Sequence, residues 1–407
     1  MRPAGTIATP CSVGLAASAG PTFVSAPAPT ARCPNGRFLG VRLRSWTVSI
    51  LAGLAAACGG VLPGAEETAP AEERPVGWRV GVAEHVSLWF HGLAYVRGRD
   101  AGERRIPVPR FAPGYVDEMN EVKRRRGVYP TPLDTAAARM AGALSGEEFD
   151  GLEFLPLYFE DASALFSSFE AWAEAGGDPR RAGSAQAARV VAFLSSLFPR
   201  PQQRQAVLQF VRLLRQEQET FFASYWQEQL PALQARAADV QREWDALAPS
   251  LAVYLDYAQL ENGELLIVPA LGAEGRLVRG GLPYPRAAVL APPARRPRDA
   301  VLAFVHETTY PIAGDAVRDY VAPAQIRELG EERLISLAAV RAGAMILEET
   351  APRLAPDYYR LYLEAIGRDV GRAADEELRR EFRTAFALPE ALEAGLVRVV
   401  ERALAGI

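Results

Sequence analysis

The chain has 407 residues, of which 49% are hydrophobic and 23% are charged, and its 45 Lys and Arg against 49 Asp and Glu give a net charge of -4. This ordinary composition excludes a fibrous or wholly disordered protein and supplies ample material for a buried core. The mild acidity argues against nucleic acid as a partner, because nucleic acid binds to basic surfaces. Lys123 is the only lysine, which we interpret as a consequence of GC-rich coding.

The start of the chain has the pattern of an export signal. Residues 1–40 are rich in Pro, Ala, Ser and Gly and show no apolar periodicity, so they are either a disordered leader or an upstream over-extension of the reading frame. Arg42 and Arg44 then precede an apolar run over 46–57 that ends in small residues, which is typical of a signal peptide. The run is shorter than the ~20 residues that a membrane-spanning helix requires. Residues 1–57 are therefore predicted to be a disordered leader and a signal peptide.

The apolar run closes on the sequence LAAAC, residues 54–58. It resembles the lipobox of bacterial lipoproteins, in which the Cys is lipidated and becomes the mature N-terminus, although Leu54 stands four residues before Cys58 instead of three. The resemblance implies an exported protein that a lipid on Cys58 anchors to a membrane of the bacterial cell envelope. An ordinary cleaved signal with an incidental Cys is the alternative. Residues 58–75, rich in Pro, Ala and Glu, are predicted to be a tether, and the chain beyond Cys58 contains no Cys for a disulfide.

Residues 76–248 are predicted to be a helical region. Apolar residues recur there at helical spacing, and the predicted helices cover 80–97, 114–126, 133–144, 161–175, 184–198, 201–229 and 231–247. The basic run KRRR and the Gly after it, residues 123–127, are typical of a helix C-terminus. His85 and His91 are six residues apart and share no helix face, so we interpret them as structural. The aromatic-rich run 221–226 is interpreted as core, with the wall of a cleft as the alternative.

Residues 249–407 mix strands with helices. Short apolar runs at 264–270 and 276–279, separated by a Gly-containing turn, predict a hairpin, and 287–290 predicts a third strand. Further helices are predicted at 299–313, 331–350, 356–367, 374–386 and 389–404. The predicted fold class is therefore α+β, predominantly α-helical with a small antiparallel sheet. A domain boundary near 248 and one continuous domain are both compatible with the pattern.

One segment, the sequence HETTY at residues 306–310, carries a pattern associated with catalysis. It resembles the His-Glu-x-x-His motif of the zincin metallopeptidases, in which both His bind zinc and the Glu polarises the attacking water. His306 and Glu307 match this motif, and Tyr310 stands where the second His is found. Like the zincins, the chain places a small sheet with a hairpin before this helix and a second helix, 331–350, after it. The resemblance implies a zincin-like fold for this part of the chain.

The resemblance also implies a third zinc ligand on the second helix. In the gluzincins that ligand is a Glu followed by small residues, and the same alignment places Arg341 at this position, with Glu348 and Glu349 as alternatives. A cation at a ligand position opposes metal binding, and the phenol of Tyr310 is a poor zinc ligand because its pKa is ~10. We therefore expect no cofactor, with zinc as the alternative, and we expect Glu307 to pair with Arg341 in a salt bridge that replaces the ion.

Three functions are compatible with these patterns. The first, which we expect, is a non-catalytic zincin-like domain that binds a peptide or protein partner at the cell envelope, in a cleft beside the helix 299–313 with residues 283–285 on its rim. The second is a zinc-dependent metallopeptidase with His306 as a ligand and Glu307 as the general base. The third is a structural envelope protein without a cleft.

Overall fold

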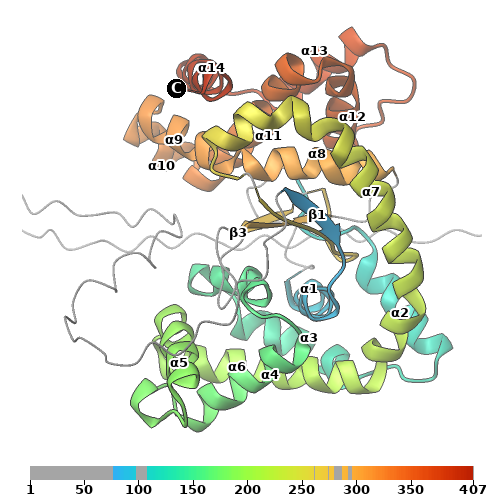
Figure 1. Ribbon diagram of the computed structural model, residues 1–407, viewed down its shortest axis with the longest axis vertical. Coiled ribbons are helices and arrows are strands. Elements are labelled where there is room, and N and C mark those ends of the chain that lie inside the picture. The colour runs from blue at the N-terminus through green and yellow to red at the C-terminus, as the bar shows by residue number, and fades with distance from the viewer. Residues whose placement is uncertain are drawn as a thin grey trace, which may run out of the picture. The chain divides into compact units, whose positions relative to one another are not determined.

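The computed structural model describes residues 77–97, 108–260, 262–273, 275–278, 287–291 and 296–406 (Figure 1). All of these residues lie in one compact unit. The predicted leader, signal peptide, tether and lipidation site at Cys58 lie outside the described residues, as do residues 283–285. The described chain is predominantly helical, as predicted, and none of its helices is both long and apolar enough to cross a membrane.

A mixed sheet of four strands lies between two groups of helices (Figure 1). The strands are, in spatial order, β1 (Trp78–Gly81), β2 (Gly263–Ile267), β4 (Ala287–Ala291) and β3 (Arg276–Val278). β1, β2 and β4 run parallel to one another, and β3 pairs antiparallel with β4. The sheet is therefore largely parallel, with one antiparallel edge strand.

The predicted antiparallel hairpin is wrong, because β4 lies between β2 and β3. The burial of β2 gives the physical reason. Leu265 and Ile267 belong to one hydrophobic core, and Leu266 belongs to another together with Val268, which follows the strand. A strand that is covered on both faces is typical of the centre of a parallel sheet, where it needs a strand at each edge.

Two hydrophobic cores thus lie on opposite faces of the sheet. The helices of the first core are α1 (Glu84–Arg97), α2 (Tyr115–Arg125), α3 (Pro132–Ala143), α4 (Ala162–Glu174), α5 (Ala185–Leu197) and α6 (Pro201–Glu217). The helices of the second core are α8 (Pro297–Thr308), α9 (Tyr310–Tyr320), α10 (Pro323–Leu329), α11 (Glu331–Thr350), α12 (Ala355–Ala365), α13 (Asp375–Ala385) and α14 (Glu390–Ala405). Every predicted helix overlaps an observed one, although α1 begins later than predicted because β1 precedes it.

One long helical segment joins the two cores. α6 continues through a π-helical turn, Gln218–Phe222, into α7 (Ala223–Tyr257). The predicted break near residue 230 is wrong, because Pro231 lies inside α7. A proline removes one backbone hydrogen bond from a helix, and here the burial of Trp226 before it and Val240 after it keeps the helix continuous.

The two regions that the sequence suggested, 76–248 and 249–407, share structural elements. Position 248 falls inside α7, and β1 from the first region pairs along its whole length with β2 from the second. The pairing favours the alternative in which the two regions form one unit.

Candidate functional site

The HETTY segment lies where one helix ends and another begins. The predicted helix 299–313 is divided, because α8 ends at Thr308 and α9 starts at Tyr310. Pro311 has no N–H to donate to the carbonyl of Glu307, so the α-helical hydrogen bonds stop there. At the junction the N–H of Thr309 donates to the carbonyl of His306 over 3.0 Å.

His306 is entirely buried in the second core. Its ring lies edge-on to the ring of Tyr310, with centroids 5.2 Å apart, and 5.0 Å from the ring of Tyr362 on α12. Among the described residues, neither ring nitrogen has a hydrogen-bond partner. Burial and the charge of Arg276 lower the pKa of His306 to about 3, against the opposing effect of the Ala339 carbonyl, so the imidazole is neutral at physiological pH.

Glu307 is held by the main chain of the segment before β3. Its Oε1 atom accepts a hydrogen bond of 2.7 Å from the N–H of Gly275, and the same oxygen lies 3.7 Å from Nε2 of His306. The side chain is only 4% exposed. The charge of Glu307 also acts on Tyr358 of α12: burial, and to a lesser extent this negative charge, raises the pKa of the Tyr358 phenol well above its usual value. The two matched residues of the motif therefore lie in the interior.

The structure does not bring the predicted ligands together. Glu348 accepts two hydrogen bonds of 3.1 Å from Arg379 and one from the hydroxyl of Tyr359, and Glu349 is exposed. No group of three or more His, Cys, Asp or Glu side chains in the described part of the chain is arranged to hold a metal ion. One imidazole flanked by two phenol rings does not fit zinc, which needs three or four good N, O or S donors.

The expected salt bridge between Glu307 and Arg341 is not formed. Arg341 pairs with Glu393 of α14 and donates a bond of 3.4 Å to the carbonyl of Phe386. It lies on the face of α11 that packs against α14, whereas Ala339 contacts the HETTY segment, its carbonyl accepting a 2.9 Å bond from the hydroxyl of Thr309. The helical turn therefore directs Arg341 away from Glu307.

Small residues and tyrosines fill the space between α8, α11 and α12. A Cβ atom on Gly343 of α11 would lie 2.3 Å from the hydroxyl oxygen of Tyr358. Tyr358 donates to the carbonyl of Val340 over 3.1 Å, and its ring contacts that of Tyr362 at 4.6 Å. The predicted helix 331–350 is thus present as α11 and packs against α8, and its small residues fit tightly against the aromatic rings of α12.

Two clusters of buried charges were not predicted from the sequence. In the first, Glu153 at the end of the 3₁₀ helix Glu147–Glu153 contacts Arg97, Arg110 and Arg276. Burial alone would raise the pKa of Glu153, but Arg276, Arg110 and Arg97 hold it at about 2. This cluster joins α1, the segment before α2, and β3.

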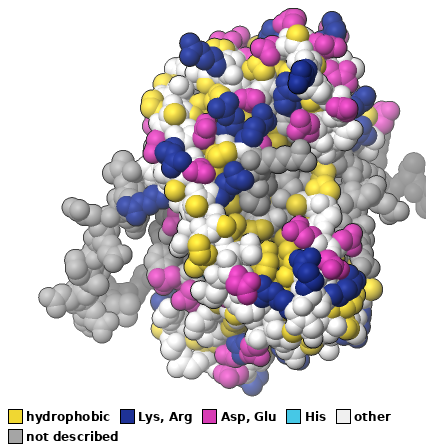
Figure 2. Space-filling view, turned by 90° about the vertical axis from the view of Figure 1, so that its right-hand side faces the viewer, with side chains coloured by type: hydrophobic (Ala, Val, Ile, Leu, Met, Phe, Trp, Pro, Cys, Tyr) yellow, Lys and Arg dark blue, Asp and Glu magenta, His cyan; other side chains and the backbone are white. Residues whose placement is uncertain are grey.

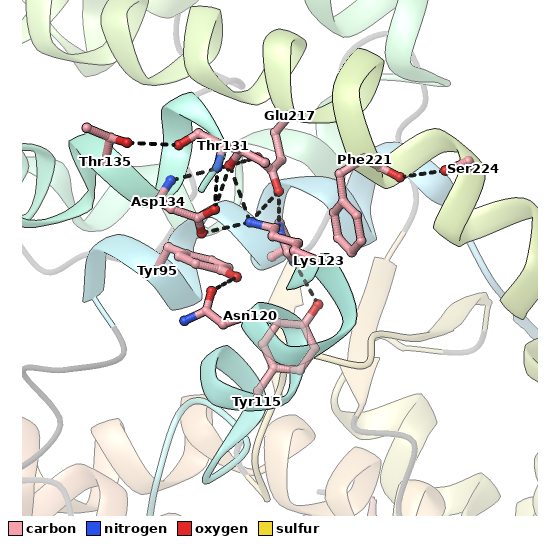
Figure 3. A network of polar contacts seen from close by, with 11 residues as sticks. Tyr95, Tyr115, Asn120, Lys123, Thr131, Asp134, Thr135, Glu217, Phe221 and Ser224 are labelled. Atoms are coloured by element: carbon pink, nitrogen blue, oxygen red, sulfur yellow. Dashed lines mark hydrogen bonds and ion pairs between the residues drawn. The ribbon is translucent and has the colours of Figure 1, made fainter. Parts of the chain in front are cut away.

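The second cluster surrounds Lys123 in the first core (Figure 3). The basic run 123–127 was interpreted only as the end of a helix, yet Lys123 is fully buried and contacts Asp134 and Glu217. The only unusual feature of this residue in the sequence is that it is the single lysine of the chain, and composition alone does not predict its burial.

A depression of about 400 Å³ is lined by Glu376, Arg379, Arg380, Arg383 and Thr384, all of α13, and two of these arginines already face Glu348. On the face drawn in Figure 2, basic and acidic side chains are interspersed and form no large field of one sign.

Comparisons of the chain with protein families, with curated proteins and with solved structures find no match.

Proposed function

We propose that this protein is an exported lipoprotein, anchored through Cys58, whose zincin-like domain is non-catalytic and binds a peptide or protein partner at the cell envelope. The observation that carries the non-catalytic part is the burial of the HETTY segment. His306 packs between two tyrosine rings, and Glu307 accepts the N–H of Gly275. A general base must reach a water molecule beside the substrate, and both side chains are instead enclosed by the core.

The arrangement of elements supports the zincin-like part of the proposal. The small sheet precedes α8 in the chain, and α11 follows it and packs against it, as the resemblance implies. The donor set, by contrast, does not fit a catalytic zinc ion, which keeps three protein ligands and one open position. We therefore derive no chemical step through a metal.

The antiparallel edge strand β3 supports a role in binding. It begins one residue after Gly275, so the main chain that holds Glu307 leads directly into the edge of the sheet. An edge strand is the place where an extended peptide can add to a sheet through main-chain hydrogen bonds. We place the partner at β3, because the residue before it, Gly275, bonds to Glu307 of the motif that the zincin resemblance singles out.

Metal analysis of the purified protein tests the non-catalytic part. We expect far less than one zinc per chain, and we expect the content to be the same in His306→Ala. Stoichiometric zinc that is lost in His306→Ala, together with peptidase activity, would favour the metallopeptidase instead. Incorporation of labelled palmitate, which Cys58→Ser should abolish, tests the anchor.

A photo-crosslinking residue at position 277, in the middle of β3, tests the binding part in intact cells. Discrete covalent adducts are expected from position 277 and not from the exposed position 397 on α14. The absence of adducts at position 277 would favour a structural envelope protein.

A further inference from the structure

The only lysine of the chain is enclosed between two carboxylates. Nζ of Lys123 lies 2.8 Å from Oδ1 of Asp134 and 2.7 Å from Oε1 of Glu217 (Figure 3). The exposed fractions of the Lys123, Asp134 and Glu217 side chains are 0%, 5% and 0%. The amine of Lys123 thus forms an ion pair with both carboxylates, and the same contacts place it within reach of a reaction with either of them.

The choice of lysine at this position is itself informative. The chain has 45 Lys and Arg residues, and all except Lys123 are Arg. The Glu153 cluster shows that this chain places arginine against a buried carboxylate. An arginine is always charged and is a better bidentate partner for a carboxylate, whereas a lysine amine can lose its proton and act as a nucleophile. The exception therefore points to nucleophilic chemistry.

Aromatic side chains complete the surroundings of Nζ. Nζ lies 4.3 Å from the ring centroid of Tyr95 and 5.3 Å from that of Phe221, so aromatic rings adjoin it besides the two carboxylates. Transfer of a proton from the ammonium group to an adjacent carboxylate removes two buried charges.

The remaining contacts supply a route for protons. Nε2 of His91 lies 3.0 Å from Oε1 of Glu217, and the hydroxyl of Thr131 lies 2.5 Å from Oε2 of Glu217 and 2.9 Å from Oδ2 of Asp134. That hydroxyl lies within hydrogen-bond distance of both carboxyl groups and so connects Glu217 with Asp134. Glu217 also ends α6 directly before the π-helical turn, a feature often found at functional sites.

We propose that Lys123 and Asp134 form an intramolecular isopeptide bond in the folded protein, with Glu217 as the proton acceptor. The ammonium group of Lys123 gives one proton to Glu217, and the freed lone pair on Nζ attacks Cγ of Asp134. The N–H of Thr131, 2.7 Å from Oδ2 of Asp134, stabilises the negative charge that develops there. Oδ1 leaves as water after it takes one proton from Glu217 and a second from Nζ.

The reaction balances without an oxidant or a cofactor. An ammonium group and a carboxylate become a neutral amide and one water molecule, and Glu217 ends in its starting state. The bond would join the C-terminal turn of α2 to the N-terminal turn of α3, where Thr131 and Asp134 form a capping box. It would provide a covalent link in a part of the chain that has no Cys.

Mass spectrometry of the intact folded protein tests the proposal directly. The expected mass is lower than the sequence mass by one water molecule. After complete tryptic digestion, peptides 111–124 and 127–139 should be recovered as one branched species, because an acylated Lys123 is no longer cleaved. Recovery of the unlinked and unmodified peptides 111–123 and 127–139 would overturn the proposal, and so would loss of the water at another site, such as the Asp150-Gly151 pair.

Three variants assign the roles. Lys123→Arg and Asp134→Ala should each have the mass calculated from the variant's own sequence, with no loss of water. Circular dichroism should establish that both variants are folded. Glu217→Gln keeps the shape of the side chain and should leave most of the protein unlinked. A bond formed in Glu217→Gln at the wild-type yield would overturn the role of Glu217 as the proton acceptor. The mass of the wild-type protein decides the existence of the bond even where a variant fails to fold.

Discussion

The side-chain amide of Gln241 on α7 bonds both to Val80 and to the residue two positions before it on β1. Its Oε1 atom accepts the N–H of Val80 at 2.7 Å, and its Nε2 atom donates to the carbonyl of Trp78 at 3.3 Å. One side chain thus takes the place of a neighbouring strand at the outer edge of the sheet. Exposed edge strands pair readily with other chains, so Gln241 and α7 close this edge, and β3 forms the other one.

Gln241→Ala should therefore destabilise the protein. The N–H of Val80 would lose its partner in a half-buried position, and an unsatisfied buried donor costs about 1–3 kcal/mol. Urea denaturation should show a lower free energy of unfolding by roughly this amount. Gln234→Ala, at an exposed position of the same helix, is the matched control and should change stability by less than about 0.5 kcal/mol. Equal effects of the two substitutions would contradict the role of Gln241.

Substitution of Glu153 should have a larger effect. Glu153→Gln keeps the volume of the side chain but removes the charge that Arg97, Arg110 and Arg276 share. Buried cations that lose their partner destabilise a fold by about 3–5 kcal/mol. The free energy of unfolding should fall by this amount in denaturant titrations.

Glu332→Gln provides the control for this prediction. Glu332 contacts the second terminal nitrogen of the Arg110 guanidinium group, at 2.8 Å, but its side chain is 67% exposed. Exposed ion pairs contribute about 0–1 kcal/mol. A Glu153→Gln variant as stable as Glu332→Gln would show that water reaches the Glu153 cluster.

The fit of Gly343 against Tyr358 predicts a steric effect. In Gly343→Ala the new Cβ atom would lie 2.3 Å from the hydroxyl oxygen and 2.8 Å from Cζ of a fully buried tyrosine. Overpacking of this kind costs about 1–3 kcal/mol. The thermal midpoint should fall, whereas Gly142→Ala in α3, where no atom lies within 4 Å of the new Cβ, should raise stability by up to about 1 kcal/mol through helix propensity. A stable Gly343→Ala protein would mean that α12 can move away from α11.

The helices could be predicted from the sequence because their signals are local. The Thr131-Pro132 start of α3 is an example, since the predicted helix 133–144 matches Pro132–Ala143 and the Thr131 side chain caps it. Such signals need only a few neighbouring residues: a capping side chain, a proline at the first turn and an apolar stripe.

The strand order could not be predicted in the same way. β1 ends at Gly81 and β2 begins only at Gly263, and no local pattern records that they pair. The apolar run 264–270 is compatible with a hairpin and with a central parallel strand, and only the burial of Leu265 and Leu266 in different cores distinguishes the two.

In the candidate site, too, local structure could be predicted from the sequence, whereas contacts between distant segments could not. His306 and Glu307 lie on a helix, as predicted, but the orientation of Arg341 toward Glu393 depends on the packing of α14, which the motif does not encode. Lys123 was missed because a basic run at a helix end is usually solvated, whereas here the rings of Tyr95 and Phe221 enclose its first residue.

The unbonded imidazole of His306 predicts a specific pH dependence of stability. The pKa of His306 is 6.5 in the unfolded chain and about 3 in the folded one, so between these values the unfolded chain binds a proton that the folded chain does not. The free energy of unfolding should therefore decrease as the pH falls below about 6.5, by up to about 1.4 kcal/mol per pH unit for this residue. Burial lowers the pKa of His91 as well, which adds a decrease of the same sign.

His306→Leu should remove the part of this pH dependence of the unfolding free energy that His306 causes. Denaturation at several values between pH 6 and 5 avoids the range in which Glu153 titrates, since its pKa is 4.5 when unfolded and about 2 when folded. At pH 8 the variant should be as stable as the wild type or more stable by about 1 kcal/mol, because two buried nitrogens without partners are replaced by apolar atoms. Tyr310→Phe, a change in the adjoining ring, should keep the wild-type slope. A His306→Leu variant that keeps the full slope would show that the imidazole is solvated or bound in the folded protein, and the enclosed, non-catalytic interpretation of the HETTY segment would then fail.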